Sequence, residues 1–113
     1  MSMRAMHEAT FLVLTSLAGG PQHGYAILAD IAEMSGDRVR LRAGTLYTAL
    51  DRLRGDGLIE VAKEQVVDGR LRRYYRLTPQ GSQTLADEAA RLRSNATVAL
   101  RRLGLGSPEL GGA

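Results

Sequence analysis

The residues best suited to chemistry in this chain are its two histidines, its carboxylates and its hydroxyl side chains. His7 and Glu8 are adjacent, as in the zinc-protease motif, but that motif needs a second histidine four residues after the first, where this chain has Phe11. The other histidine, His23, stands at the start of an expected helix, where it would cap the helix or support its packing. The sequence has neither a glycine-rich phosphate loop with its lysine nor a nucleophile-elbow motif. We therefore predict no enzyme activity, no metal site and no cofactor.

Positive charge is concentrated in the middle of the chain. The 113 residues carry 15 basic and 12 acidic side chains. Between residues 38 and 76 there are ten basic and five acidic side chains, so the rest of the chain is slightly acidic. Such a concentration is the electrostatic footprint of a polyanion, although a solvated surface rich in arginine gives the same composition. The positions of the charges have to decide between these two interpretations.

A short amphipathic helix lies within this basic region. Leu46, Leu50 and Leu53 recur at helical spacing, which predicts a helix that begins near Ala43 and ends at Gly55. Its outer face then carries small and polar side chains, which let a helix backbone approach base edges in the major groove of DNA. Longer side chains at its margins reach phosphates or guanine edges. The expected DNA contacts of this helix are Arg42, Gly44, Thr45, Tyr47, Thr48 and Arg52.

A basic β-hairpin is expected directly after this helix. Residues 58–67 and 70–77 read as strands, and the Asp68-Gly69 pair between them is the strongest short-range hairpin signal. Apolar residues alternate along both strands, so one face is expected to pack on the helices while the tip projects. A recognition helix followed by such a wing is typical of DNA-binding proteins. The wing residues expected to grip the DNA are Lys63, Arg70, Arg72 and Arg73.

Two more helices and a short strand are expected before this helix and hairpin. Helices are predicted over residues 3–18 and 23–34, and a short strand over 39–41. The first helix is apolar on every face near its centre, which favours a contact with a second subunit. The alternative is that this helix only wraps a compact core of its own chain.

The last helix is expected to pair two copies of the chain. Thr78 and Pro79 are typical of a helix start. Apolar residues then recur at alternating spacings of four and three, as in the seam of a coiled coil. A helix lying on its own core also shows a stripe, but usually a wider one, so a homodimer is favoured. The expected interface residues are Phe11, Leu12, Leu85, Ala89, Leu92, Ala96, Ala99 and Leu103.

These elements predict a mainly α fold with a small β-hairpin: a winged helix-turn-helix followed by a long dimerisation helix. The expected boundaries are 1–78 for the DNA-binding domain, 79–103 for the last helix and 104–113 for a disordered, glycine-rich tail. The chain has no cysteine, which fits a reducing compartment. Its longest apolar stretch is far shorter than the ~20 residues of a membrane span. A cytoplasmic protein without a membrane partner is expected.

The sequence also resembles the PadR family of bacterial winged-helix transcriptional regulators. The resemblance rests on three blocks: His23-Gly24-Tyr25, Gly44-Thr45-Leu46-Tyr47 and Arg73-Tyr74-Tyr75-Arg76-Leu77-Thr78. It implies a homodimeric repressor that binds inverted repeats in promoters, of the short subgroup with a single last helix. Family members commonly carry Ser or Pro where this chain has Ala43, and Pro where it has Thr48. These differences lie on the presumed DNA face and therefore concern the operator sequence rather than the fold.

Two further expectations concern partners. Some short members of the family hold planar aromatic drugs between subunits, stacked on tryptophan, and this chain has no tryptophan. The small residues of the last helix either leave room for a small aromatic effector or let two helices approach closely. The alternative function is a winged-helix module that binds an acidic protein. Against it, the wing carries arginines rather than the aromatic and methionine anchors of protein interfaces.

Overall fold

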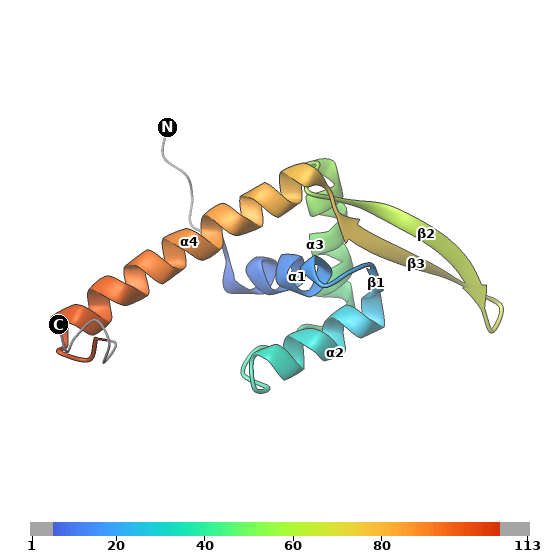
Figure 1. The fold of residues 1–113 in the computed structure, drawn as a ribbon. Helices are drawn as coiled ribbons and strands as arrows, with labels where there is room; N and C mark the ends of the chain where they lie inside the picture. The colour runs from blue at the N-terminus through green and yellow to red at the C-terminus, as the bar shows by residue number, and fades with distance from the viewer. Residues whose placement is uncertain (1–5, 107–113) are drawn as a thin grey trace.

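A computed structural model of the chain describes residues 6–106. Figure 1 shows three helices gathered at the base of a long β-hairpin, with the last helix extending away on the opposite side. This is the predicted mainly α fold with a small sheet, a winged helix-turn-helix followed by a long helix. In chain order the elements are α1 (Glu8–Ala18), β1 (Gln22–His23), α2 (Gly24–Met34), α3 (Ala43–Gly55), β2 (Ile59–Val67), β3 (Arg70–Leu77) and α4 (Pro79–Arg102).

The core is built from apolar side chains that recur at helical spacing in α1, α2 and α3. Burying one such aliphatic side chain stabilises the fold by roughly 1.5–3 kcal/mol. Helices of 11 to 13 residues are marginal in isolation, so these three depend on their shared core. The sheet closes the core from one side. The buried apolar residues are Val13, Leu14, Leu17, Ile27, Ile31, Leu46, Leu50, Leu53, Ile59 and Tyr75.

The β2–β3 hairpin turns at Asp68 and Gly69, as predicted. Their φ angles of 53° and 75° are both positive, which is the combination that a two-residue type I′ turn requires. The strands pair antiparallel, with one irregularity between Val61 and Lys63. A bulge of this kind increases the local twist of a strand pair, and Figure 1 shows the hairpin as a curved ribbon that reaches beyond the helices.

The expectation of a short strand at residues 39–41 is wrong. The segment 39–41 is a loop, because the backbone N–H and C=O of Val39 both bond to the hydroxyl of Ser35 and not to a neighbouring strand. The structure instead forms β1, which the sequence pattern does not indicate. Gln22 and His23 pair with β3 and complete a three-stranded sheet in the order β1-β3-β2.

A polar network fixes β1 to the helices. The Gln22 Nε2 group donates to the carbonyl oxygen and to the hydroxyl of Ser16, both at 2.8 Å. Ser16 in turn donates its hydroxyl to the Asp30 carboxylate at 2.7 Å. Ser16 is 2% exposed, and a buried hydroxyl left without a partner costs about 1–3 kcal/mol. The network therefore sets where β1, and through it the hairpin, attaches to α1 and α2.

Two helices begin with the caps that their sequences indicate. The Nδ1 atom of His23 accepts the backbone N–H of Ala26 at 3.3 Å at the start of α2. The Thr78 hydroxyl accepts the backbone N–H of Gly81 at 3.0 Å at the start of α4, with Pro79 in the first helical position. Each cap satisfies a backbone donor that the helix itself leaves without a partner.

α1 begins later than predicted. Its first residue is Glu8, because His7 is extended with a ψ of 145°. Residues 3–5, which the prediction included, lie outside the described residues. The centre of α1 is partly buried within this chain at Phe11 and Leu12, so its contact with a second subunit stays a prediction.

α4 packs on the domain along its first half, where Leu85 contacts the core and Glu88 is buried. Gly81 lies directly against the backbone of Leu58, whereas Leu103 at the far end is 70% exposed. The helix ends in a Schellman motif, in which Leu105 donates its N–H to Leu100 and Gly104 has a φ of 76°. The expected tail therefore starts with an ordered turn, and its residues 107–113 lie outside the described part.

Candidate nucleic-acid interface

The outer face of α3 carries short side chains, as predicted. The three leucines of the helix are at most 2% exposed, and they fix its rotation against the core. Gly44, Thr45 and Thr48 are exposed. A Cβ atom added to Gly44 would meet no atom within 4 Å, so the space in front of the helix is open. A base edge can therefore approach the backbone of α3 closely.

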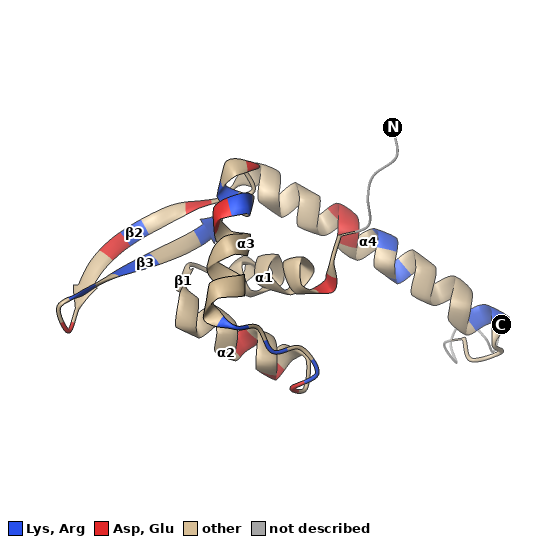
Figure 2. Ribbon diagram, turned by 180° about the vertical axis from the view of Figure 1, so that it is seen from behind, with Lys and Arg blue, Asp and Glu red and all other residues tan. Residues whose placement is uncertain are grey.

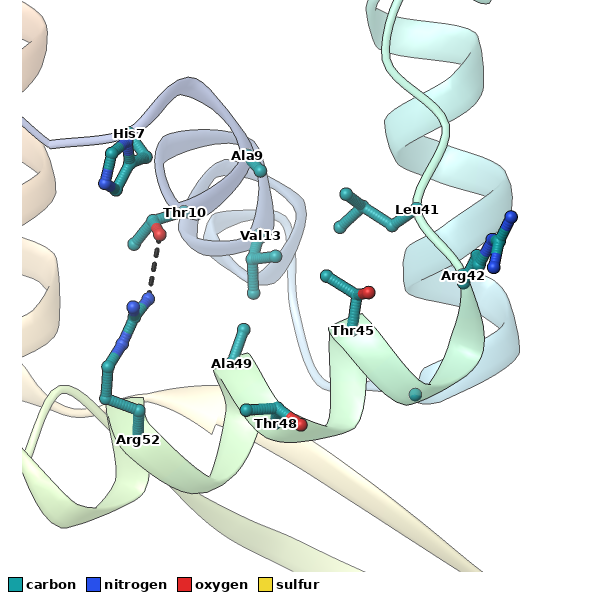
Figure 3. A pocket seen from close by; sticks show the side chains of 11 residues that line it. His7, Ala9, Thr10, Val13, Leu41, Arg42, Thr45, Thr48, Ala49 and Arg52 are labelled. Carbon is teal, nitrogen blue, oxygen red and sulfur yellow. Dashed lines mark hydrogen bonds between the residues drawn. The ribbon is translucent and has the colours of Figure 1, made fainter.

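Two hollows follow the two flanks of α3. The wing-side hollow, of about 740 Å³, lies between α3, the start of α2 and the hairpin. The α1-side hollow, of about 680 Å³, lies between α3 and α1 (Figure 3). The predicted DNA contacts Tyr47, Arg70, Arg72 and Arg73 line the first hollow, and Arg42, Gly44, Thr45, Thr48 and Arg52 line the second.

Tyr47 projects from α3 into the wing-side hollow and is 43% exposed. Its hydroxyl lies over Gly24 at the start of α2, where a Cβ atom would overlap it. Partial burial, and then the neighbouring Tyr75 and Tyr25, raise the pKa of Tyr47 above its ordinary value. The phenol is therefore neutral near pH 7 and is able to donate a hydrogen bond to an anion.

The basic residues of the hairpin differ in their surroundings. Arg73 Nε donates to the Glu64 carboxylate across the strands at 2.9 Å, so this predicted contact is already engaged. The Lys63 ammonium lies 4.6 Å from the centre of the Tyr74 ring, outside both hollows. Among the described residues, Arg70 and Arg72 take part in no ion pair. These two arginines are the hairpin cations most available to a phosphate.

His23 joins the wing to the helices. Its ring meets the ring of Tyr74 edge to face, with the centroids 5.4 Å apart. Partial burial, and then the positive charge of Arg72, lower the pKa of His23 below its ordinary value. The neutral imidazole thus keeps Nδ1 available as the acceptor that caps α2.

Arg42 and Arg52 border the α1-side hollow. Arg42 precedes the first residue of α3 and is exposed. Arg52 reaches across the hollow and donates to the Thr10 hydroxyl of α1 at 2.9 Å, as Figure 3 shows. Both predicted residues are therefore placed beside the outer face of α3.

The predicted set omits several residues that the fold places beside these hollows. Tyr25, which is 66% exposed, and Asp51 line the wing-side hollow. His7 and Thr10 line the α1-side hollow. Tyr25 belongs to the His23-Gly24-Tyr25 block, so the sequence motif could have identified it as a candidate site residue. The placement of His7 and Thr10, by contrast, depends on how α1 crosses α3.

The charged residues are not evenly distributed over the elements. Figure 2 shows Lys and Arg along the hairpin, near the end of α3, in the loop between α2 and α3, and on α4. Acidic residues lie among them on the hairpin, where the Glu60–Arg76 pair at 2.8 Å neutralises one site near its base. Basic residues are therefore present on each segment that flanks α3, although α4 carries arginines as well.

The chain matches the family described as Transcriptional regulator PadR-like family over residues 13–87. This span includes the whole of α2, α3 and the hairpin, together with parts of α1 and α4. The chain belongs to the PadR-like family. The family and the solved relative from Eggerthella lenta are described as transcriptional regulators.

Two curated relatives match this PadR-like chain in part. Transcriptional regulator Rv3488 of Mycobacterium tuberculosis is 48% identical over 56 residues, which are 50% of this chain and 51% of that protein. The "Uncharacterized 37.1 kDa protein in transposon TN4556" of Streptomyces fradiae is 46% identical over 83 residues, 74% of this chain and 22% of that protein. The chain thus spans about half or less of the length of these relatives.

Solved structures share the fold. A PadR family transcriptional regulator from Eggerthella lenta superposes with a TM-score of 0.70 at 28% identity, covering 83% of this chain and 80% of that one. PadR from Bacillus subtilis in complex with operator DNA superposes with a TM-score of 0.64 at 24% identity, covering 72% and 46% respectively. At 24% identity, the similarity to the Bacillus subtilis structure is a similarity of fold.

The last helix of this PadR-like chain exposes most of its apolar stripe. Leu85 packs against the core of its own chain, whereas Leu92 is 40% exposed. Leu12 also packs against that core, from α1. Of the predicted interface residues on α4, those exposed are Ala89, Leu92, Ala96, Ala99 and Leu103.

Residues 6–106 contain neither a membrane-spanning helix nor a cluster of potential metal ligands. None of their helices combines the length and the apolar character that crossing a membrane requires. The same residues hold no group of three or more His, Cys, Asp or Glu side chains placed to bind a metal ion.

Proposed function

We propose that this PadR-like regulator is a homodimeric repressor that recognises an inverted repeat in a promoter. The observation that carries the proposal is the exposed ridge of α3 between two hollows. Nine of the ten side chains or backbone positions expected to contact DNA line these hollows, and Lys63 lies nearby on the hairpin. A ridge with such flanks has the shape that insertion into a groove requires.

The dimensions support insertion into the major groove. An α-helix with its side chains is about 10–12 Å wide, and the major groove of B-DNA is about 12 Å wide. Short residues on the outer face of α3 allow it to enter without displacing bases. Arg70 and Arg72 on the hairpin then contact the phosphates beside the groove, and the neutral hydroxyl of Tyr47 donates to a phosphate between them.

The exposed stripe of α4 supports a homodimer. The exposed apolar side chains on this helix lose their contact with water when a second copy packs against them. Two α3 helices related by a two-fold axis read two half-sites about 34 Å apart, one helical turn of DNA. We thus take residues 1–78 as the DNA-binding part and 79–103 as the dimerisation helix.

The small residues of α4 are compatible with two arrangements of the proposed dimer. Ala89, Ala96 and Ala99 either bring two helices close together or leave space for a small aromatic effector between them. A screen of planar aromatic compounds, read as the shift of the unfolding temperature, separates these two arrangements because a ligand bound to the native dimer stabilises it.

Fluorescence anisotropy on DNA duplexes tests the proposed function. The protein is titrated onto labelled duplexes from the region upstream of its own gene and onto a shuffled control, over a series of salt concentrations. We expect a preference of about 10³ or more for one upstream duplex. Log affinity should fall linearly with log salt, by about 0.9 per phosphate neutralised.

Equal binding to every duplex at all salt concentrations contradicts a sequence-specific repressor. In that case a pull-down with acidic proteins tests whether the basic face serves a protein partner. The oligomeric state is measured separately by analytical ultracentrifugation, where a monomer at micromolar concentration contradicts the proposed dimer.

A further inference from the structure

The α1-side hollow is lined by residues of α1, of α3 and of the segments that precede these helices, and only Arg42 and residues of α3 were expected to contact DNA. Figure 3 shows Ala9, Thr10 and Val13 of α1 facing Thr45, Ala49 and Arg52 of α3 across the hollow. Among the described residues, its lining contains two arginines and no carboxylate. The wing-side hollow, by contrast, includes Asp51 and Asp68. The α1-side hollow is therefore the more favourable of the two for an anion.

Two side-chain contacts hold α1 in place beside this hollow. The Arg52 guanidinium donates to the Thr10 hydroxyl at 2.9 Å and bridges the two walls. Arg38 donates to the Glu8 carboxylate through two hydrogen bonds, one of them 3.1 Å long, and ties the first turn of α1 to the loop before α3. These bonds from Arg38 lower the pKa of Glu8, so this acid, which lies between the lining residues His7 and Ala9 in the sequence, already has a cation as partner.

The lining suits the repeating chemistry of a sugar–phosphate strand. Guanidinium and hydroxyl groups are the common partners of phosphate oxygens. Alanine side chains and threonine methyl groups offer small apolar contacts to deoxyribose between them. The floor of the hollow, at Val13 and Leu41, is apolar and continuous with the core.

We propose that the α1-side hollow receives one sugar–phosphate strand of the duplex, so that α1 is part of the DNA interface. The inference rests on the proposed insertion of α3 into the major groove. Because the helix is about as wide as the groove, the two strands that border the groove lie against its two flanks. One strand meets the wing-side hollow. The other meets Arg52 and the Thr10 hydroxyl, with His7 at the edge of the same surface.

A matched pair of charge substitutions tests this assignment. Ala9→Glu places a carboxylate on the α1 wall, in the first turn, where the helix dipole favours an acid. Ala29→Glu makes the same change of net charge on the exposed side of α2, away from both hollows. Circular dichroism and thermal unfolding first confirm that both variants keep the fold.

We expect Ala9→Glu to weaken binding about tenfold or more, because a carboxylate within about 5 Å of a phosphate repels it. The loss should be equal on the upstream duplex and on the shuffled duplex, since phosphates carry no sequence. Ala29→Glu should change affinity no more than about twofold, because bulk salt screens distant charges. Ala9→Lys should strengthen binding and steepen the salt dependence by about 0.9 in slope, while Ala29→Lys should not.

The outcomes separate this inference from the proposed function. Equal effects of the two glutamate variants overturn the α1 contact, while a retained preference of the wild type for its upstream duplex leaves the proposed repressor standing. If the wild type binds all duplexes equally, specific repression fails, and the comparison of Ala9 with Ala29 variants still decides the α1 contact. A protein that binds no DNA overturns both.

Discussion

Gly24 controls the position of Tyr47, and its substitution by alanine is expected to weaken DNA binding without unfolding the protein. A Cβ atom at Gly24 would overlap the hydroxyl oxygen of Tyr47 and lie 2.8 Å from its ring carbon Cζ. Real Cβ atoms do not approach other atoms so closely, so one group has to move. The Tyr47 ring is the group that moves, because it is 43% exposed and open to the wing-side hollow.

The cost to stability is moderate. Expelling the ring fully would expose roughly 100 Å² and cost about 2.5 kcal/mol at ~25 cal/mol per Å². Alanine in place of glycine in a helix returns up to ~1 kcal/mol. If the ring is expelled fully, the free energy of unfolding of Gly24→Ala should therefore fall by about 1.5 to 2.5 kcal/mol, and by less if the ring only shifts, as measured in urea at fixed protein concentration.

Gly24→Ala should also weaken DNA binding. With the hydroxyl displaced, the hydrogen bond proposed between Tyr47 and a phosphate is lost, and we expect about a tenfold loss of affinity, or ~1.4 kcal/mol. The loss should be the same on specific and shuffled duplexes.

A double-mutant cycle with Tyr47→Ala decides whether Gly24 acts through Tyr47. Once the ring is absent, Gly24→Ala should leave affinity unchanged and should stabilise the fold by up to ~1 kcal/mol. An equal loss of affinity in both backgrounds refutes the reasoning, and so does an unchanged affinity of the single variant Gly24→Ala.

Two further substitutions test the frame that carries the site. In Gly81→Ala the new Cβ atom overlaps the backbone carbonyl of Leu58, which cannot rotate away, so we expect a loss of more than about 2 kcal/mol in urea unfolding; Gly55→Ala, whose Cβ atom meets nothing, should lose nothing. His23→Asn keeps an N-cap but cannot titrate. The pKa of His23 in the folded protein lies below its ordinary value of 6.5. The contribution of His23 to stability is therefore complete above pH 6.5 and is lost as the pH falls through the folded-state pKa. When the pH is lowered from 7.5 to 5.5, the free energy of unfolding should therefore fall more for the wild type than for His23→Asn. An equal fall in both proteins would show that titration of His23 does not affect stability.

The parts of the fold that the sequence predicts correctly are those set by neighbouring residues. The Asp68-Gly69 pair determines its turn through its own φ angles, and Thr78-Pro79 caps α4 through a bond to Gly81. The leucines of α3 fix the rotation of that helix by spacing alone. Each of these features depends on residues that lie close together in the sequence.

The features that the sequence pattern misses depend on distant segments. β1 exists because Gln22 pairs with β3 and bonds to Ser16, and neither contact leaves a pattern of alternation at residues 22 and 23. The Thr10–Arg52 bond joins residues 42 positions apart, so no local spacing could have placed Thr10 beside α3. The candidate site was therefore predictable on α3 and on the hairpin, but not on α1.

The side chains of α3 also determine how its DNA affinity should divide between bases and phosphates. A bidentate contact from a long side chain to a base contributes about 1–3 kcal/mol of discrimination. Gly44, Thr45 and Thr48 on the outer face offer no bidentate group, and Arg52 is directed toward α1. The contacts proposed for the hairpin arginines are to phosphates, which carry no sequence information. Most of the affinity should therefore come from phosphates, while specificity rests on a few bases and on the spacing of two α3 helices, which is why the salt series and the shuffled duplex must be measured together.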